Sequence, residues 1–208
     1  MQEFWNDRYR SEDYVYGKAP NRFFKECLRR LNIAGYLLLP AEGEGRNAVH
    51  AAKIGLQVDA FDISEEGRRK ALLLAEEQNV NITYYLGSLE NTPLKGRKYD
   101  AVALIFAHFP PEIRSGYHRN FAEMLKPGGH LILEAFHKNH LTYQAQNPAV
   151  GGPKSEAMLM DEEEIAHDFK DLENLQLYKK EVTLKEGNGH EGQGLVLRFI
   201  GRKSTENR

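Results

Sequence analysis

The chain has 208 residues, which is enough for one well-buried core and typical of a single α/β domain. Its 28 Lys and Arg nearly balance 30 Asp and Glu, and no basic stripe is interleaved with aromatic residues, so we expect no nucleic-acid partner. The single cysteine, Cys27, excludes an internal disulfide, and the absence of a membrane-length apolar stretch or signal peptide predicts a cytoplasmic protein that needs no membrane.

The first part of the chain alternates between helical and strand patterns. WNDRYRSEDYVYGKAPN is rich in tyrosine and turn residues, and Asn21 follows as a candidate N-cap. The pattern then predicts a helix over residues 22–31, a strand over 36–39, the turn AEGEGRN, a helix over 47–54 and a strand over 56–61.

The middle of the chain continues this alternation. Ser64 is placed to cap a helix over residues 68–78, and NITYYLG is a third strand. The link SLENTPLKGRK is too short for a crossover helix. AVALIF is apolar throughout, as a central parallel strand should be, and a helix runs from Pro110 and Pro111 to LKPGG. HLILEAF is the fifth strand.

The last part predicts a capped helix and a hairpin. Asp161 with Glu164 resembles a capping box, and Met160 with Ile165 forms its hydrophobic staple. Strands over 175–184 and 195–201 follow, joined by a loose glycine-rich turn, EGNGHEGQG. The fold class is therefore α/β: a doubly wound, Rossmann-like seven-stranded sheet, mainly parallel with a C-terminal antiparallel hairpin.

The turn AEGEGRN and the acid Asp62 form a candidate nucleoside site. Ligands of such sheets bind at the carboxyl ends of the strands, near the point where the winding reverses. A G-x-G turn lets backbone approach a ligand, and Asp62, 17 residues after Gly45, can accept hydrogen bonds from ribose hydroxyls. Gly43-x-Gly45-x-x-Ala48 also fits the dinucleotide fingerprint, and a turn that only joins strand to helix is the plain alternative.

The ordered series GYLLLPAEGEGRN, DAFDIS, KYDAVALIF and LKPGGHLILEAF resembles that of class I S-adenosylmethionine-dependent methyltransferases. The resemblance covers residues 36–136. The N-terminal WNDRY and YVYGKAPNRF extend it toward the small-molecule branch that includes thiopurine and tellurite-resistance methyltransferases. It implies one methyltransferase domain over 1–208: a lid segment and helix (1–35), a cofactor-binding core (36–136) and an acceptor side (137–208).

The resemblance also implies which residues bind S-adenosyl-L-methionine. They are Glu42, Gly43 and Gly45 at the methionine and ribose, Asp62 at the ribose hydroxyls, Ile63 on the adenine, Ser88 and Leu89 at the adenine edge, and Phe106 at the amino-acid end. Leu39 stands where the family usually has an acid, with Pro40 and Ala41 where Leu-Gly is common. Our hypothesis is that Glu42 substitutes as the anion for the cofactor's ammonium group.

Three residues are the candidates for catalysis: His108 after the fourth strand, His190 in the hairpin and Tyr16 in the N-terminal segment. The sixth strand should run parallel to the first five, which brings His190 to their carboxyl edge. Each has a plainer interpretation: His108 as a helix cap, His190 as an exposed loop residue, Tyr16 as packing. His137 and His140 lack a third ligand at metal-binding spacing, so we expect no metal site.

The predicted function is methyl transfer to a small-molecule acceptor, possibly a thiol or another soft nucleophile, by in-line displacement. An NAD-dependent oxidoreductase using the same turn is one alternative, and a non-catalytic cofactor-binding domain is the other. No catalytic Asn/Asp-Pro-Pro-aromatic motif follows the fourth strand, where the sequence is AHFP. A chain of this size can act as a monomer.

Overall fold

The computed structural model describes residues 1–205. Its elements in chain order are α1 (Gln2–Tyr9), α2 (Arg22–Arg30), β1 (Tyr36–Pro40), α3 (Arg46–Lys53), β2 (Gln57–Asp62), α4 (Glu65–Glu77), β3 (Thr83–Leu86), β4 (Tyr99–Ile105), α5 (Pro111–Glu123), β5 (Leu125–Phe136), α6 (Leu141–Gln146), α7 (Glu162–Asp168), β6 (Glu173–Glu186) and β7 (His190–Arg202). Short 3₁₀ turns cover Leu89–Asn91, Lys138–His140, Pro148–Val150 and Glu156–Met158.

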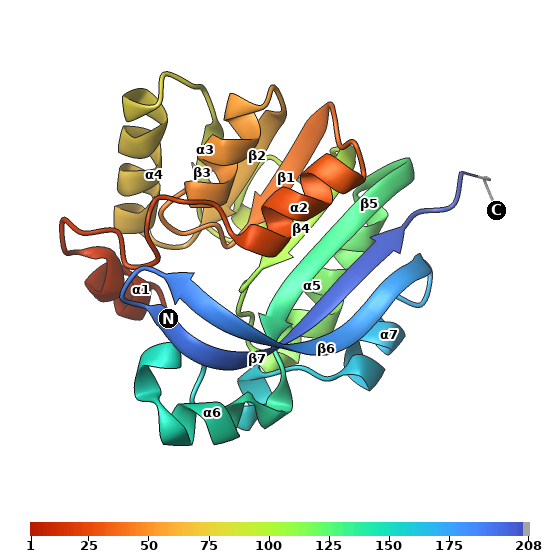
Figure 1. The fold of residues 1–208 in the computed structure, drawn as a ribbon. Coiled ribbons are helices and arrows are strands. Elements are labelled where there is room, and N and C mark those ends of the chain that lie inside the picture. The colour runs from red at the N-terminus through yellow and green to blue at the C-terminus, as the bar shows by residue number, and fades with distance from the viewer. Residues whose placement is uncertain (206–208) are drawn as a thin grey trace.

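The strands form one seven-stranded sheet in the order β3-β2-β1-β4-β5-β7-β6 (Figure 1). Neighbouring strands among β1–β5 pair in parallel, whereas β7 pairs antiparallel with both β5 and β6. β6 therefore runs in the direction of β1–β5, as predicted, and the hairpin end lies at their carboxyl edge. The predicted fold class is confirmed, and the winding reverses between β1 and β4.

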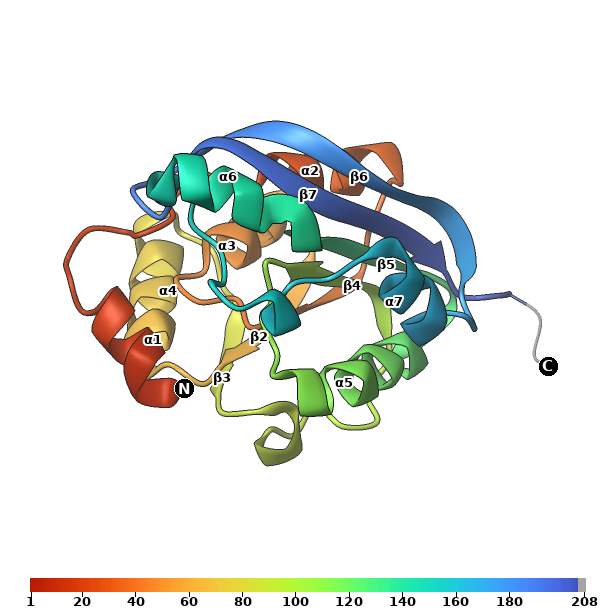
Figure 2. The same ribbon diagram turned by 90° about the horizontal axis from the view of Figure 1, so that it is seen from below.

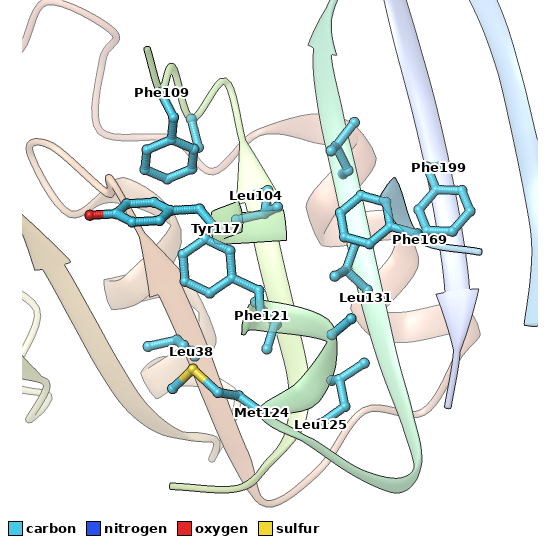
Figure 3. Close-up of a cluster of buried hydrophobic side chains, with 14 of the residues drawn as sticks. Leu38, Leu104, Phe109, Tyr117, Phe121, Met124, Leu125, Leu131, Phe169 and Phe199 are labelled. Atoms are coloured by element: carbon cyan, nitrogen blue, oxygen red, sulfur yellow. The ribbon is translucent and has the colours of Figure 1, made fainter. Parts of the chain in front are cut away.

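Helices cover both faces of the sheet because side chains along each strand alternate between them. Leu38 points to the side of α5 and α7, where it joins a cluster that includes Phe121 and Phe169 (Figure 3). Leu37 and Leu39 point to the opposite side, which α2, α3 and α4 cover. Both clusters are buried, so β1 and β4 read as continuous apolar runs.

Three predicted helix starts are confirmed by their caps. The side chains of Asn21, Ser64 and Asp161 each accept a hydrogen bond from the backbone N–H three residues later. Each cap satisfies one of the otherwise unpaired N–H groups of the first turn, at a gain of about 1 kcal/mol. These caps fix where α2, α4 and α7 leave the preceding loop.

The prediction of a loose turn in the terminal hairpin is wrong. β6 continues to Glu186 and β7 begins at His190, so residues 187–189 are the whole turn. The Gly189 N–H donates to the carbonyl of Val15 at 2.9 Å, and a Cβ on Gly189 would lie 2.5 Å from the ring of Tyr16. The glycines thus let the hairpin end pack closely on the N-terminal segment.

The N-terminal segment is ordered by a buried lysine on α4. α1, which the sequence did not predict as a helix, packs against α4. The Lys70 ammonium donates to the carbonyls of Ser11 (2.9 Å) and Asp13 (2.7 Å) and lies 2.5 Å from Oε1 of Glu44. Both charged side chains of this pair are nearly inaccessible to solvent. The pair therefore connects α4, the turn after β1 and the chain between α1 and α2.

Two further side chains, from the first turn of α3, hold the same segment. Arg46 donates to the carbonyl of Tyr16 at 3.2 Å, and Asn47 accepts from the N–H of Asn21 at 2.9 Å.

Among residues 1–205, no helix is long and apolar enough to cross a bilayer. The predicted cytoplasmic location stays a prediction.

We expect Lys70→Met to destabilise the protein by about 3–5 kcal/mol, because Glu44 would remain buried without a cation. Urea unfolding measures this change, and limited proteolysis should show earlier cleavage between residues 9 and 21. Lys18→Met is the matched control, because Lys18 pairs with Glu77 at an exposed position and should have a much smaller effect. Equal effects of the two substitutions would contradict this role for Lys70.

Candidate functional site

A cavity of about 270 Å³ lies at the carboxyl ends of the strands, where the winding reverses. Its walls are the turns after β1, β2 and β4, helix α1, Tyr16 and the hairpin residue His190. Figure 2 looks onto this edge, with α1 on one side and α5 with α7 on the other. The position is the one that the sheet topology predicts for a ligand.

Asp62 lies at the end of β2 on the wall of this cavity and is only 7% exposed. Its carboxylate accepts from the N–H groups of Gly43 (3.0 Å) and Ser64 (2.8 Å). Burial raises the pKa of Asp62 to about 6, although these hydrogen bonds oppose the shift. Each oxygen keeps accepting capacity, so the group can receive hydrogen bonds from a ligand's hydroxyls.

Glu42 is the second acid on the cavity wall, and its side chain also caps the first turn of helix α3. Gly45, the N-cap residue, has no side chain to offer, and Oε1 of Glu42 instead accepts from the N–H groups of Asn47 (2.8 Å) and Ala48 (2.7 Å). Burial raises the pKa of Glu42 to about 7 against these hydrogen bonds. Oε2 has only a 3.4 Å contact with the Asn47 amide, so it can face a ligand cation.

The two glycines of the turn are explained by packing. Gly43 has φ +60°, and a Cβ there would lie 2.6 Å from the hydroxyl of Tyr9; Gly45 has φ +84°, and its Cβ would lie 2.5 Å from Cβ of Ala71. Neither glycine is among the residues that line the cavity. Their predicted contact with a cofactor stays a prediction, while the close contacts in the structure are with α1 and α4.

The other predicted cofactor residues divide into two groups. Ile63, Ser88 and Phe106 line the cavity, whereas the side chain of Leu89 is buried in the core on the α5 side. Phe106 has φ +50°, an uncommon conformation for a non-glycine residue, directly after β4. Its ring lies 4.6 Å from that of Phe136 and so forms a rigid aromatic wall.

The three candidate catalytic residues come together, although they come from distant parts of the chain. Tyr16, His108 and His190 line the first cavity and also a second one of about 220 Å³ beside it. The rings of Tyr16 and His190 are 4.5 Å apart, and the Tyr16 hydroxyl accepts from Nε of Arg8 at 2.9 Å. The three side chains therefore form part of the boundary between the cavities, together with Met1 and Trp5, which also line both. His190 is 3% exposed and not an exposed loop residue.

His108 is a neutral, half-buried imidazole. Burial, with smaller contributions from His190, Arg114 and Arg8, lowers the pKa of His108 to about 3. Its Nδ1 is buried and has no hydrogen-bond partner among the described residues. The ring can therefore exchange a hydrogen bond with a ligand but does not carry a charge near neutral pH.

The remaining histidines after β5 have structural roles. His137 contacts Glu162 at 3.0 Å, and Nδ1 of His140 accepts from the Leu195 N–H while its Nε2 contacts the Gly151 carbonyl. Within residues 1–205, no group of three His, Cys, Asp or Glu is arranged to hold a metal ion. Gly152 and Pro153, from the same connection, line the second cavity.

Several residues of the site were missed by the sequence reasoning. Trp5 and Arg8 reach the cavities because residues 2–9 form helix α1. The short, polar sequence of these residues does not indicate a helix. Lys70 offered a signal, because it lies on the same helical face as Leu74, which is apolar and buried. A lysine on a buried face requires a partner.

The known proteins to which this chain is similar include methyltransferases. Residues 40–129 match the model of a family described as "Methyltransferase domain". The chain is 28% identical over 134 residues to the ubiquinone biosynthesis O-methyltransferase of Vibrio vulnificus, covering 63% of this chain and 52% of that protein. The chain thus spans about half the length of the curated relatives it matches first.

Solved structures share the fold over nearly the whole chain. One, from work on the conversion of a disulfide bond into a thioacetal group in echinomycin biosynthesis, has a TM-score of 0.79 at 14% identity and covers 100% of this chain and 94% of that one. Magnesium protoporphyrin IX methyltransferase of Synechocystis PCC 6803, with bound S-adenosylhomocysteine, has a TM-score of 0.72 at 19% identity over 98% of both chains. TehB of Haemophilus influenzae has 0.69 at 19% identity over 98% of this chain and 67% of that one. The predicted resemblance to S-adenosylmethionine-dependent methyltransferases is confirmed.

The raised pKa of Glu42 predicts a pH dependence of stability. Between its ordinary value of 4.5 and about 7, the folded protein keeps a proton that the unfolded chain releases, so this residue lowers the free energy of unfolding as pH rises. Glu42→Gln should therefore gain stability relative to the wild type between pH 4.5 and pH 7.5, as measured by urea unfolding. Glu76→Gln, on the exposed face of α4, controls for removal of a carboxylate. A difference between Glu42→Gln and wild type that does not change with pH would contradict the assignment.

Proposed function

We propose that the protein transfers a methyl group from S-adenosyl-L-methionine to a small-molecule acceptor that carries a thiol or hydroxyl group. The observation that carries the proposal is the pair of adjoining cavities with a shared wall of Tyr16, His108 and His190. One cavity has the acids and apolar surface that suit a charged nucleoside. The other is lined mainly by apolar and aromatic side chains and suits an acceptor.

The residues of the first cavity fit the proposed cofactor. Asp62 has accepting capacity for ribose hydroxyls, Glu42 for an ammonium group, and Ile63 with Phe106 offers apolar surface for the adenine and the amino-acid arm. When bound, S-adenosyl-L-methionine supplies an electrophilic methyl group on a sulfonium. The protein's own contribution is to hold both reactants and exclude water, and such positioning can contribute roughly 7–11 kcal/mol.

Within this proposal the predicted parts of the chain have distinct roles. Residues 36–136 bind the cofactor, residues 1–35 cover it through α1 and Tyr16, and residues 137–208 supply the acceptor side through Pro153, Met158 and His190. A protein that binds the cofactor without turnover is the alternative, and the assay below separates the two. The matches reported above include no oxidoreductase.

The comparisons support an oxygen or sulfur acceptor. The Vibrio vulnificus relative is named for O-methylation, and the echinomycin structure for chemistry at a disulfide. Among residues 1–205, no carboxylate lines the second cavity and Arg8 is the one charged side chain on its wall, which disfavours a protonated amine. A thiol has the additional advantage that its thiolate is strongly nucleophilic near neutral pH.

The acceptor prediction is tested by product formation with a matched panel of small aromatic acceptors. Thiophenol, phenol and benzylamine present sulfur, oxygen and nitrogen on similar rings, and S-adenosylhomocysteine release measures turnover. We expect turnover with thiophenol or phenol and none with benzylamine. Turnover with benzylamine alone would contradict the acceptor class, and binding of the cofactor without turnover of any broader acceptor set would favour the non-catalytic alternative.

The cofactor site is tested by two substitutions on the same strand. Asp62→Asn should weaken S-adenosyl-L-methionine binding about tenfold or more, because a hydrogen bond to a charged group contributes about 1.5–3 kcal/mol. Asp59→Asn is the control: Asp59 is also buried on β2 but binds Arg97 and Tyr99 and lines neither cavity. Equal loss of affinity in both variants would contradict the ribose role of Asp62.

A further inference from the structure

The end of the terminal hairpin forms a carboxylate–imidazole pair beside both cavities. Glu186 is the last residue of β6 and His190 the first of β7, and the two lie directly opposite each other in the strand pairing. Oε2 of Glu186 is 3.3 Å from Nδ1 of His190. The turn between them packs on residues 15–17 of the N-terminal segment through Gly187 and Gly189. Both side chains are therefore held by the fold rather than by a free loop.

Glu186 is surrounded by donors. Arg46 donates to its Oε2 at 2.8 Å, and Asn21 donates to its Oε1 at 2.9 Å. Burial by itself would raise the pKa of Glu186, but the His190 hydrogen bond and the Arg46 charge lower it to about 2. The group is therefore a carboxylate at neutral pH and can only accept hydrogen bonds. The proton of its contact with a neutral His190 must then reside on Nδ1.

The other ring nitrogen of His190 is free. Nε2 makes no hydrogen bond to any residue within 1–205, and the ring lines both cavities. Tyr16, Phe106 and Phe136 pack around the ring at centroid distances of 4.5, 4.8 and 5.1 Å. With the proton on Nδ1, Nε2 carries a lone pair at the boundary between the cavities.

The other histidines near the cavities differ from His190. His140 uses both ring nitrogens in contacts with backbone, and its Nδ1 accepts from an N–H, which requires the opposite tautomer. His108 has no carboxylate partner, and its lowered pKa keeps it neutral. His190 is therefore the cavity histidine whose positive charge a buried carboxylate would stabilise.

We propose that Glu186 is a positioning residue that holds His190 as the Nδ1–H tautomer, so that Nε2 accepts the proton of the acceptor's thiol or hydroxyl group. This inference rests on the proposed function and adds to it the group that removes the proton from the acceptor. The acceptor's S–H or O–H bond breaks, and its proton goes to Nε2. The electron pair left on the acceptor's sulfur or oxygen forms the bond to the methyl carbon, while the bond from that carbon to the donor sulfonium breaks and its electron pair stays on the sulfur of the leaving S-adenosylhomocysteine. The charge on His190 is balanced by Glu186, and the proton passes to water after the products leave.

The tautomer can be measured without knowing the acceptor. In nitrogen-15 correlation spectra of the histidine side chains, the wild-type protein should show a protonated Nδ1 and an unprotonated Nε2 for His190. The His190 signals are assigned as those that disappear in the spectrum of His190→Gln. Glu186→Gln should move the proton wholly or partly to Nε2. Glu191→Gln, an exposed neighbour on the same hairpin, should leave the His190 signals unchanged.

Titration gives a second readout. Glu186 raises the pKa of His190 against burial, so Glu186→Gln should lower the pH at which His190 becomes charged, and Glu186→Asp should partly restore it. The other ionisable or charged groups that face the ring or its surroundings stay in all variants: Arg46, Arg8, Tyr16, His108 and His140. Thermal unfolding identifies any variant that fails to fold.

The outcomes separate this inference from the proposed function. An Nε2–H tautomer in the wild type, or spectra and titration unchanged in Glu186→Gln, would overturn the inference. A turnover number reduced roughly 10²-fold in Glu186→Gln with unchanged S-adenosylhomocysteine affinity, and restored by a rise in pH, would support it. If the tautomer is as predicted and no acceptor is methylated, the proposed function fails while the role of Glu186 toward His190 stands.

Discussion

The architecture of the site depends on one constraint: a lysine and a glutamate are buried together, and the surrounding backbone must supply their remaining hydrogen-bond partners. The Lys70 ammonium on α4 can donate more hydrogen bonds than the one to Glu44, and the carbonyls of Ser11 and Asp13 accept two of them. A buried charge without a partner would cost several kcal/mol. The pairing of these charges therefore holds the chain between α1 and α2 against the turn after β1. Without that segment, the cavity would lose the wall that α1 and Tyr16 provide.

The same segment connects α3 to the terminal hairpin. Arg46 binds both the carbonyl of Tyr16 and the carboxylate of Glu186, so α3, the N-terminal segment and the end of β6 share one cation. The pKa values of the acids and of the imidazoles around this network are shifted in opposite directions, and burial is the cause of both shifts. Burial raises the pKa of Asp62 and Glu42 and lowers the pKa of His108 and His190. A cavity with two neutral imidazoles on its wall suits chemistry in which a cationic methyl donor meets a neutral or anionic nucleophile.

Much of the fold could be predicted because its signals are local. The apolar run AVALIF gave a central strand, and Asn21, Ser64 and Asp161 gave helix starts, since propensity, periodicity and capping agree there. The glycine-rich run from Glu186 to Gly194 misled because glycine signals loops in general. Here Gly187 and Gly189 are required by close contact with another segment, which a single sequence does not reveal.

The site was predictable in its position and less so in its partners. Strand order brought His108 and His190 to one edge, as the topology argument anticipated, and contacts with Lys70 and Arg46 hold the segment that carries Tyr16 beside them. The pairing of Glu186 with His190 spans a hairpin turn whose length was not foreseen, and the burial of Glu44 depends on Lys70 from another element. The close contacts of the turn glycines with Tyr9 and Ala71 could not be read from a single sequence, and the predicted contact of these glycines with a cofactor stays a prediction.

The central claim is that the cavity at the carboxyl ends of the strands binds S-adenosyl-L-methionine. Calorimetric titration of the purified protein with S-adenosylhomocysteine and, separately, with NAD tests it most directly. The structure and the family match predict saturable one-site binding of S-adenosylhomocysteine and no binding of NAD. Binding of NAD alone would contradict the account, because the turn after β1 would then serve a dinucleotide; binding of neither ligand would mean that Glu42 and Asp62 do not form a cofactor site.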